Sequence, residues 1–237
     1  ETMAELFDLG LAFSKAPLPK GDNVAIITNA GGGGVLSVDA MERYDLDLVK
    51  FDEETNARLK EAVPEEGSIK NPIDVLGDAP VIRYKESLEA VLDSDDVDGL
   101  VVMVCPTASA DADGIAQALV EGASEFDKPV IAVNMGGPTF ENANDVLRDN
   151  GIPTYVFPET AVKVFDYLAR FAAVQDRNYD DPVGAVDDVD KAAVEAIFAK
   201  VKEEERDTLL GSEAYAVAEA YGIEAAPIKP ALDMNKN

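Results

Sequence analysis

Five short apolar runs, rich in β-branched residues and separated by stretches of helical periodicity, constrain the fold of this chain more than any other feature. The runs lie at residues 24–28, 46–51, 99–104, 130–133 and 154–157. Strands that are apolar on both sides belong to a parallel sheet whose two faces are covered by helices. The sequence therefore predicts an α/β fold with a doubly wound, mainly parallel five-stranded sheet.

The stretches between and after these runs have the apolar spacing of helices that pack on a sheet. The predicted helices cover residues 35–44, 80–92, 111–125, 139–150 and 158–174. Asn150-Gly151 is a typical helix end, and Pro158 is a typical first helical residue. Helical extensions are expected at both ends of the chain, over residues 1–14, 190–206 and 212–221, with Ser212 as a cap and Gly222 as a stop.

Breaks in this pattern divide the chain into four segments. Residues 1–19 hold a helix with an apolar face and a proline-containing linker, and they look like the end of a preceding domain. Residues 20–175 contain the whole predicted sheet. Residues 176–188 are polar and acidic and are predicted to be a linker. Residues 189–237 are helical but too few to form a domain by themselves.

The net charge of −27, from 47 acidic and 20 basic residues, excludes several functions. A surface this acidic repels the phosphates of nucleic acid and anionic lipid, so neither is an expected partner. The 47% of hydrophobic residues argues against disorder. No apolar stretch reaches the ~20 residues of a membrane span, and no signal peptide is recognisable, so a cytoplasmic protein is expected. The acid excess is typical of a protein from a halophile, although an ordinary acidic protein is the alternative.

The absence of histidine and the presence of one cysteine, Cys105, exclude further chemistry. The chain itself supplies no imidazole base, phosphohistidine or histidine metal ligand. Cys105 forms no internal disulfide, and we expect it to be a buried small hydrophobe. No nucleophile with a base and no metal-ligand spacing is recognisable, so no catalytic or metal-binding residue is expected in this chain.

A glycine-rich segment follows the first predicted strand. Its residues, which are expected to bind an anion, are Asn29, Ala30, Gly31, Gly32, Gly33 and Gly34. Consecutive glycines allow backbone N–H groups to converge on a phosphate at a helix N-terminus. The segment matches neither the P-loop nor the dinucleotide fingerprint. The alternative is a tight turn in which glycine only permits close packing.

Two further loops follow other predicted strands and helices. In the long loop 64–79, Asn71 and Pro72 are expected to form an extended turn that presents Asp74 toward the glycine segment; a purely structural turn is the alternative. After the third strand, Thr107 or Ser109 is expected to cap the next helix; the free N–H groups there holding a phosphate is the alternative, and the two are compatible. The second phosphate-binding group is therefore Thr107, Ala108, Ser109 and Ala110.

Four motifs carry a resemblance to a known family. They are Leu18-Pro19-Lys20-Gly21, the run from Val24 to Gly32, the run from Asn71 to Ala79, and the run from Gly151 to Glu159. In this order they resemble the NDP-forming acyl-CoA synthetases, which are the ADP-forming acetate–CoA ligases of the succinyl-CoA synthetase superfamily. Gly33 departs from the family, which usually has proline there.

The resemblance implies a flavodoxin-like fold and a place in a larger enzyme. The family combines a CoA-binding domain, two ligase domains and an ATP-grasp pair, and this chain looks like the second ligase domain. Residues 1–19 then resemble the end of the first ligase domain, and residues 189–237 the start of the ATP-grasp part. The family's phosphohistidine would lie in the first ligase domain, which this chain does not contain.

The resemblance also implies the ligands and partners. The whole enzyme would use CoA, ADP or ATP, phosphate and Mg, with none bound tightly by this part alone. Its partners would be the CoA-binding and first ligase domains and the ATP-grasp domains, and a homo-oligomer is compatible with the sequence. The isolated part is expected to be inactive. Two alternatives stay open: a regulatory domain fused to an acetyltransferase, and a flavodoxin-type mononucleotide binder.

Overall fold

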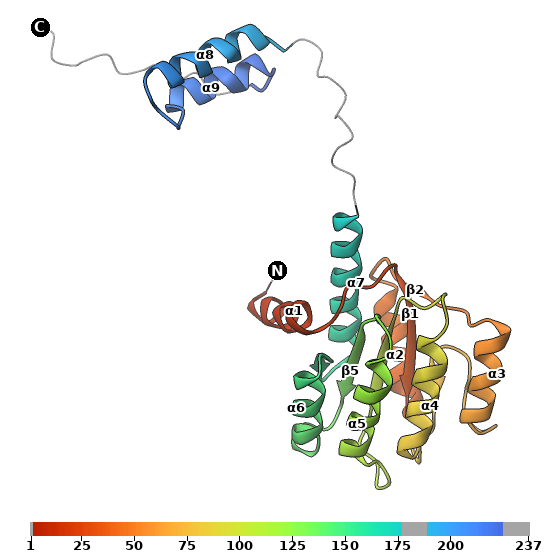
Figure 1. Ribbon diagram of the computed structural model, residues 1–237. Coiled ribbons are helices and arrows are strands. Elements are labelled where there is room, and N and C mark those ends of the chain that lie inside the picture. The colour runs from red at the N-terminus through yellow and green to blue at the C-terminus, as the bar shows by residue number, and fades with distance from the viewer. Residues whose placement is uncertain (1, 177–188, 225–237) are drawn as a thin grey trace, which may run out of the picture. The chain divides into compact units, whose positions relative to one another are not determined.

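The computed structural model describes residues 2–176 and 189–224, which belong to two separate compact units. The first unit is an α/β domain with a six-stranded parallel sheet between two layers of helices (Figure 1). Its strands are β1 (Asn23–Thr28), β2 (Asp47–Leu48), β3 (Ile73–Asp74), β4 (Gly99–Val104), β5 (Val130–Asn134) and β6 (Thr154–Tyr155). The strand order is β2-β1-β4-β5-β6, and β3 also pairs with β1. Without β3 this is the flavodoxin-like order, so the predicted fold class is confirmed.

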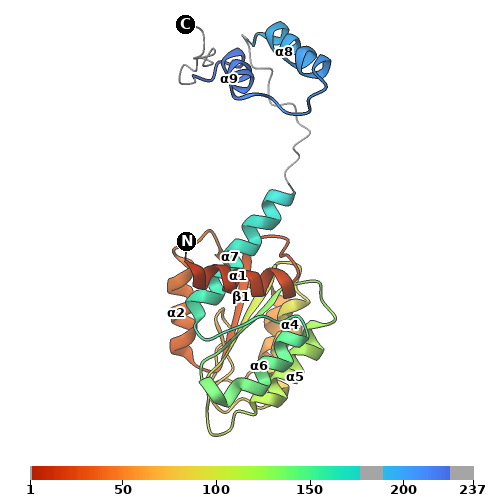
Figure 2. The same cartoon turned by 90° about the vertical axis from the view of Figure 1, so that its left-hand side faces the viewer.

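The helices cover both faces of the sheet. One face carries α1 (Met3–Lys15), α2 (Gly31–Met41) and α7 (Pro158–Gln175), and in Figure 2 α2 lies to the left of the sheet while α4 and α5 lie to its right. The other face carries α3 (Glu53–Ala62), α4 (Val81–Leu92), α5 (Ala112–Ala123) and α6 (Glu141–Asp149), with the short 3₁₀ helix η1 (Gly137–Phe140) before α6. Alternate strand residues feed the two cores: Ile27 and Val102 face α3–α6, whereas Ile26 and Val101 face α2 and α7.

The outer edge of β1 explains why two strands differ from the prediction. Along β1, β2 pairs with Asn23 and Val24, and β3 pairs with Ile27 and Thr28. The two short strands share one edge, so β2 is shorter than the predicted run 46–51. β3 lies in the segment that was predicted to be a long loop. A strand of two residues has too little periodicity to be recognised from sequence.

Several predicted helix ends are confirmed by the backbone. Pro158 is the first residue of α7, and Gly151 ends α6 with a left-handed φ of 88°. The start of α2 was predicted too late, because Gly31 to Gly34 are already helical. Glycine has a low helix propensity, which hides a first turn of this composition.

The second unit is a hairpin of α8 (Lys191–Glu203) and α9 (Gly211–Ala220). Ser212 was predicted to cap α9, and this prediction is wrong. The helix begins at Gly211, and Leu210 occupies the N-cap position. Glu213 accepts a hydrogen bond from the Leu210 N–H and a two-point contact from Arg206. The Arg206 hydrogen bonds hold the pKa of the Glu213 carboxyl below its ordinary value. Gly222 has φ 74° and ends α9 as predicted.

Most of the predicted linker 176–188, and residues 225–237 of the last segment, lie outside the described residues. In the described part of the chain, no helix is both long enough and apolar enough to cross a membrane.

Candidate anion-binding site at the carboxyl end of the sheet

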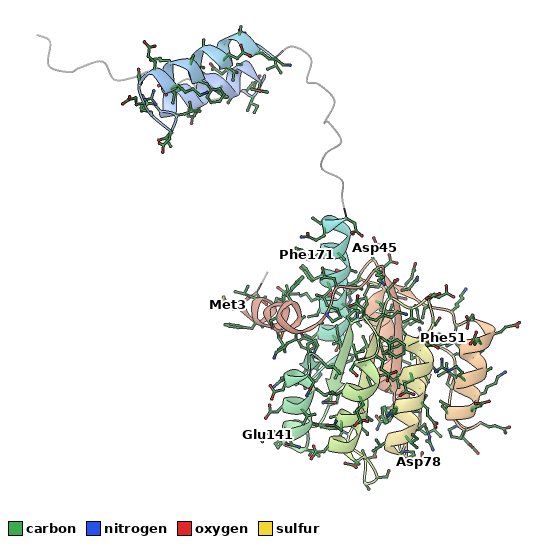
Figure 3. The ribbon with its side chains drawn as sticks, viewed as in Figure 1. Met3, Asp45, Phe51, Asp78, Glu141 and Phe171 are labelled. Carbon is green, nitrogen blue, oxygen red and sulfur yellow. The ribbon has the colours of Figure 1, made fainter. Side chains whose placement is uncertain are left out.

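The loops predicted to carry function leave the carboxyl ends of β1, β3 and β4, which are neighbours in the sheet. After β1 the chain turns to one face as α2, and after β4 it turns to the other face as α5. This is the topological switch point at which doubly wound domains bind ligands. Figure 3 shows Asp78 at this end of the domain and Asp45 at the opposite end.

The glycine segment is the first turn of α2 and not a loop. The N–H groups of Gly33 and Gly34 donate to the Ala30 carbonyl, at 2.9 and 3.3 Å. Within the described residues, the N–H groups of Gly31 and Gly32 have no hydrogen-bond partner. The turn has no acidic residue and no side-chain cap. The start of α2 therefore presents two free donors at the positive end of a helix.

The Asn29 side chain joins the β1 and β4 loops. Its Nδ2 donates to the Cys105 carbonyl at 2.9 Å, and its Oδ1 accepts from the Cys105 N–H at 2.8 Å. The carboxamide thus pairs with the backbone of β4 as a peptide group would. Asn29 was predicted as a phosphate-binding residue, but in this structure its side chain holds the two loops together.

Asn71 makes a similar contact at the outer edge of β1. Its Oδ1 accepts from the Ile26 N–H at 2.9 Å, and its Nδ2 donates to the Val24 and Val49 carbonyls at 2.9 and 3.1 Å. These bonds lie where β2 has ended and β3 has not begun. Asn71, which precedes Pro72 through a cis peptide bond, therefore completes the hydrogen bonding of the sheet edge.

Asp74 lies beside the glycine turn. Its Oδ2 would be 3.2 Å from a Cβ atom on Gly31, and its Oδ1 accepts from the Leu76 N–H at 2.9 Å. Gly31 and Asp74 both line a hollow of about 450 Å³, together with Thr28, Asn71 and Pro72. An anion bound by the Gly31 and Gly32 N–H groups would share the helix end with the Asp74 carboxylate.

The loop after β4 is bonded to the loop after β3. The hydroxyls of Thr107 and Ser109 donate to the Gly77 carbonyl, at 2.7 and 3.3 Å. One of these hydroxyls was predicted to cap α5, and this prediction is wrong. The Asp111 carboxylate is the cap, because it accepts from the Gly114 N–H at 3.0 Å. Asp111 is the N-cap residue of α5, whereas Ser109 and Thr107 lie two and four residues earlier in the chain. The N–H groups of Ala108 and Ser109 have no partner within the described residues.

Two residues of this site, Leu76 and Gly77, were missed by the sequence analysis. Leu76 has a left-handed φ of 69°, which is unusual for a branched side chain and turns the chain toward Thr107. Gly77 and Thr107 are separated by 30 residues, so no local pattern links them. The hydroxyls around Ala108 were a signal for hydrogen bonding but did not identify the acceptor.

The site contains few cationic side chains. Arg83 donates to the Val75 carbonyl at 2.7 Å and pairs with Asp78 at 3.0 Å, so its charge is already partnered. Within residues 2–176 and 189–224, no three His, Cys, Asp or Glu side chains are grouped to hold a metal ion. An anion bound here would therefore depend on main-chain N–H groups, which formal charge does not reveal.

Cys105 is expected to react slowly with alkylating agents. Burial raises the pKa of its thiol, and the Sγ atom lies 3.8 Å from the Met135 sulfur. Because the thiolate is the reactive form, iodoacetamide at pH 8 should modify the folded chain about tenfold more slowly than the chain in guanidinium. Mass spectrometry gives the two rates directly, since the sequence has one cysteine. Equal rates would show that the thiol is exposed and normally ionised.

These features define a class: a flavodoxin-like α/β domain with unpartnered main-chain N–H groups at its switch point. The Ligase-CoA domain family matches residues 24–177. The chain belongs to this family.

Three relatives illustrate the match. The 4-hydroxybutyrate–CoA ligase (ADP-forming) of Nitrosopumilus maritimus is 34% identical over 94% of this chain and 32% of that protein. The subunit alpha of acetate–CoA ligase (ADP-forming) II of Pyrococcus furiosus is 38% identical over 73% of this chain and 38% of the subunit. The structure of an acetyl-coenzyme A synthetase of Ca. Korarchaeum cryptofilum, in complex with phosphate and ADP, has a TM-score of 0.66 at 31% identity, over 75% of this chain and 40% of that one. The chain thus spans about a third of the length of the curated relatives it matches.

Proposed function

We propose that this chain is the second ligase domain of an ADP-forming acyl-CoA synthetase. Such an enzyme converts acyl-CoA, ADP and phosphate into the free acid, CoA and ATP. The Ligase-CoA match and the ADP-forming ligases among the relatives support this assignment. The catalytic histidine, which this chain lacks, would be supplied by the first ligase domain.

The observation that carries the proposal is the set of unpartnered N–H groups at the switch point. Gly31 and Gly32 provide two, and Ala108 and Ser109 provide two more. In the proposed reaction, phosphate displaces CoA from the acyl group, the phosphoryl group passes to histidine, and ADP then accepts it. A phosphoryl group in transfer carries charge on its oxygens, and fixed backbone donors stabilise that charge.

We assign residues 189–237 to the start of the ATP-grasp part and residues 1–19 to the end of the first ligase domain. The lengths of the matches support the first assignment. The match to the N. maritimus ligase, which is a single chain, extends over 227 residues. The match to the P. furiosus subunit alpha extends over 180 residues, which is close to the size of the first unit. The nucleotide and its Mg would then bind mainly outside the first unit.

We further assign the protein to the cytoplasm of an organism with a salt-rich interior. The support is the net charge of −27, because screening in concentrated salt removes most of the self-repulsion of such a surface. The expected ligand is still an anion, because backbone donors at a helix end act at short range whatever the net charge.

Reconstitution tests the proposal. The chain alone should not phosphorylate ADP, and turnover should appear when the CoA-binding, first ligase and ATP-grasp modules of the same enzyme are added. In the reconstituted enzyme, Gly31→Pro should lower kcat/KM for phosphate about tenfold, because it removes one N–H donor. Proline is well tolerated at the first position of a helix, so the fold should survive.

Gly31→Ala is the matched control. It introduces the same Cβ atom beside Asp74 but keeps the N–H group, so kcat/KM should stay within about threefold of the wild type. Equal losses in the two variants would show that the N–H group of Gly31 holds no phosphate. Absence of turnover from correctly assembled modules would refute the assignment to the synthetase.

A further inference from the structure

The outward face of α1 is apolar although the helix is firmly held on its inward side. Met3, Leu6 and Phe7 are 66, 61 and 71% exposed. On the inward side, Ala12 is buried, the Asp8 carbonyl accepts from the Tyr155 hydroxyl at 2.6 Å, and Glu5 pairs with Lys163. Figure 3 shows Met3 pointing away from the domain. The exposed side chains are therefore presented in a fixed position.

Gly10 continues the same face one turn further along α1. A glycine inside a helix lowers stability relative to alanine. A Cβ atom at Gly10 would have no atom within 4 Å in this structure, so packing inside the unit does not require glycine here. A small residue in an apolar helix face lets another helix approach closely. Met3, Leu6, Phe7 and Gly10 together are called the α1 stripe.

We propose that the α1 stripe docks a helix of the CoA-binding and first ligase part of the same enzyme. The proposal rests on the function proposed above. The family match begins at residue 24, so α1 lies outside the Ligase-CoA domain proper. The chain spans 32% of the undivided relative, and the remaining two thirds of such an enzyme must contact it somewhere.

Binding in trans tests the proposal. The probe is the CoA-binding and first ligase part of the enzyme, produced as one separate polypeptide and titrated into the full 237-residue chain by calorimetry. Phe7→Ser should weaken binding roughly thirtyfold, as expected for a central apolar contact. The matched control is Ile82→Ser on α4, because Ile82 is 54% exposed on the opposite face of the sheet. It should leave the affinity unchanged.

Gly10→Ala is expected to have two opposite effects, a more stable chain and weaker binding of the partner, and so distinguishes docking from helix stability. In the chain alone it should raise Tm by about 2 °C, because alanine favours the helix and the Cβ atom has free space. In the titration it should weaken binding about tenfold, because the added methyl group keeps the partner helix away.

The possible results distinguish the docking surface, a second copy as its occupant, and the proposed function. Binding that Phe7→Ser and Gly10→Ala leave unchanged would overturn the docking surface and keep the proposed function. Self-association of the chain that Phe7→Ser abolishes would show a second copy as the occupant and overturn the proposal. Failure of both binding and restored turnover would count against the proposed function itself.

Discussion

Replacing Asn71 by alanine is expected to lower the free energy of unfolding by about 3–5 kcal/mol. The substitution removes three hydrogen bonds between the carboxamide and the backbone, to Ile26, Val24 and Val49. The Ile26 N–H is buried and would lose its partner without gaining water, whereas the Val24 carbonyl would keep only the bond from the Val49 N–H at 3.2 Å. A buried group left unsatisfied costs about 1–3 kcal/mol, which makes this loss large for a single side chain.

Urea unfolding monitored by circular dichroism measures the loss. Asn56→Ala is the matched control, because the Asn56 carboxamide also donates to two carbonyls, those of Phe51 and Asp52, but at the helix start of α3 near the surface. The control should cost less than about 1 kcal/mol, since water replaces the lost partners. A similar small cost for Asn71→Ala would show that the sheet edge does not depend on this carboxamide.

Asn71→Asp should be at least as destabilising as the alanine variant at pH 7. A carboxylate would face the Val24 and Val49 carbonyls, which lie 2.9 and 3.1 Å from the present Nδ2 atom. These contacts and burial raise the pKa of the new carboxyl group in the folded state. A raised pKa means that the deficit is largest above the folded pKa and shrinks as the pH falls and the acid is protonated. A deficit that does not change between pH 7 and pH 4 would contradict this.

Gly33→Pro is expected to cost about 3 kcal/mol in this protein, although proline is the residue that the family resemblance implies at this position. A Cβ atom on Gly33 would overlap the sulfur of Met103, which is fully buried in β4. Overpacking of this kind costs about 1–3 kcal/mol, and proline also removes the hydrogen bond from the Gly33 N–H to the Ala30 carbonyl. The glycine and the methionine therefore form a matched pair.

A double-mutant cycle measures this pairing. Met103→Ala alone should be destabilising through the cavity that it leaves, but Gly33→Pro should cost at least about 1 kcal/mol less in the Met103→Ala background. Gly32→Ala is the control in the same turn, because no atom lies within 4 Å of its Cβ position and the change should stabilise α2 slightly. Additive costs of Gly33→Pro and Met103→Ala would show that the two residues do not compete for space.

The two asparagines show where prediction from sequence stopped. Asn29 and Asn71 were recognised as loop residues near the ligand site, and the structure uses both carboxamides to replace peptide groups. An asparagine in a loop has the same local signature whether it binds a ligand, closes a turn or bonds to a strand. The partners of Asn71 and Asn29 lie 22–76 residues away in the chain, so only the fold selects among these roles.

The sequence alone determined the alternation of strands and helices, the helix ends at Gly151 and Gly222, and the glycine segment that follows β1. These features are local: they depend on periodicity, on glycine and on proline. The tertiary structure decided the rest. The pairing of β3 with β1, the bonds from Thr107 and Ser109 to Gly77, the fit of Met103 against Gly33 and the exposure of the α1 stripe all join or separate residues that are distant in the chain. Such contacts arise only when the layers pack, because the same local pattern is compatible with many partners.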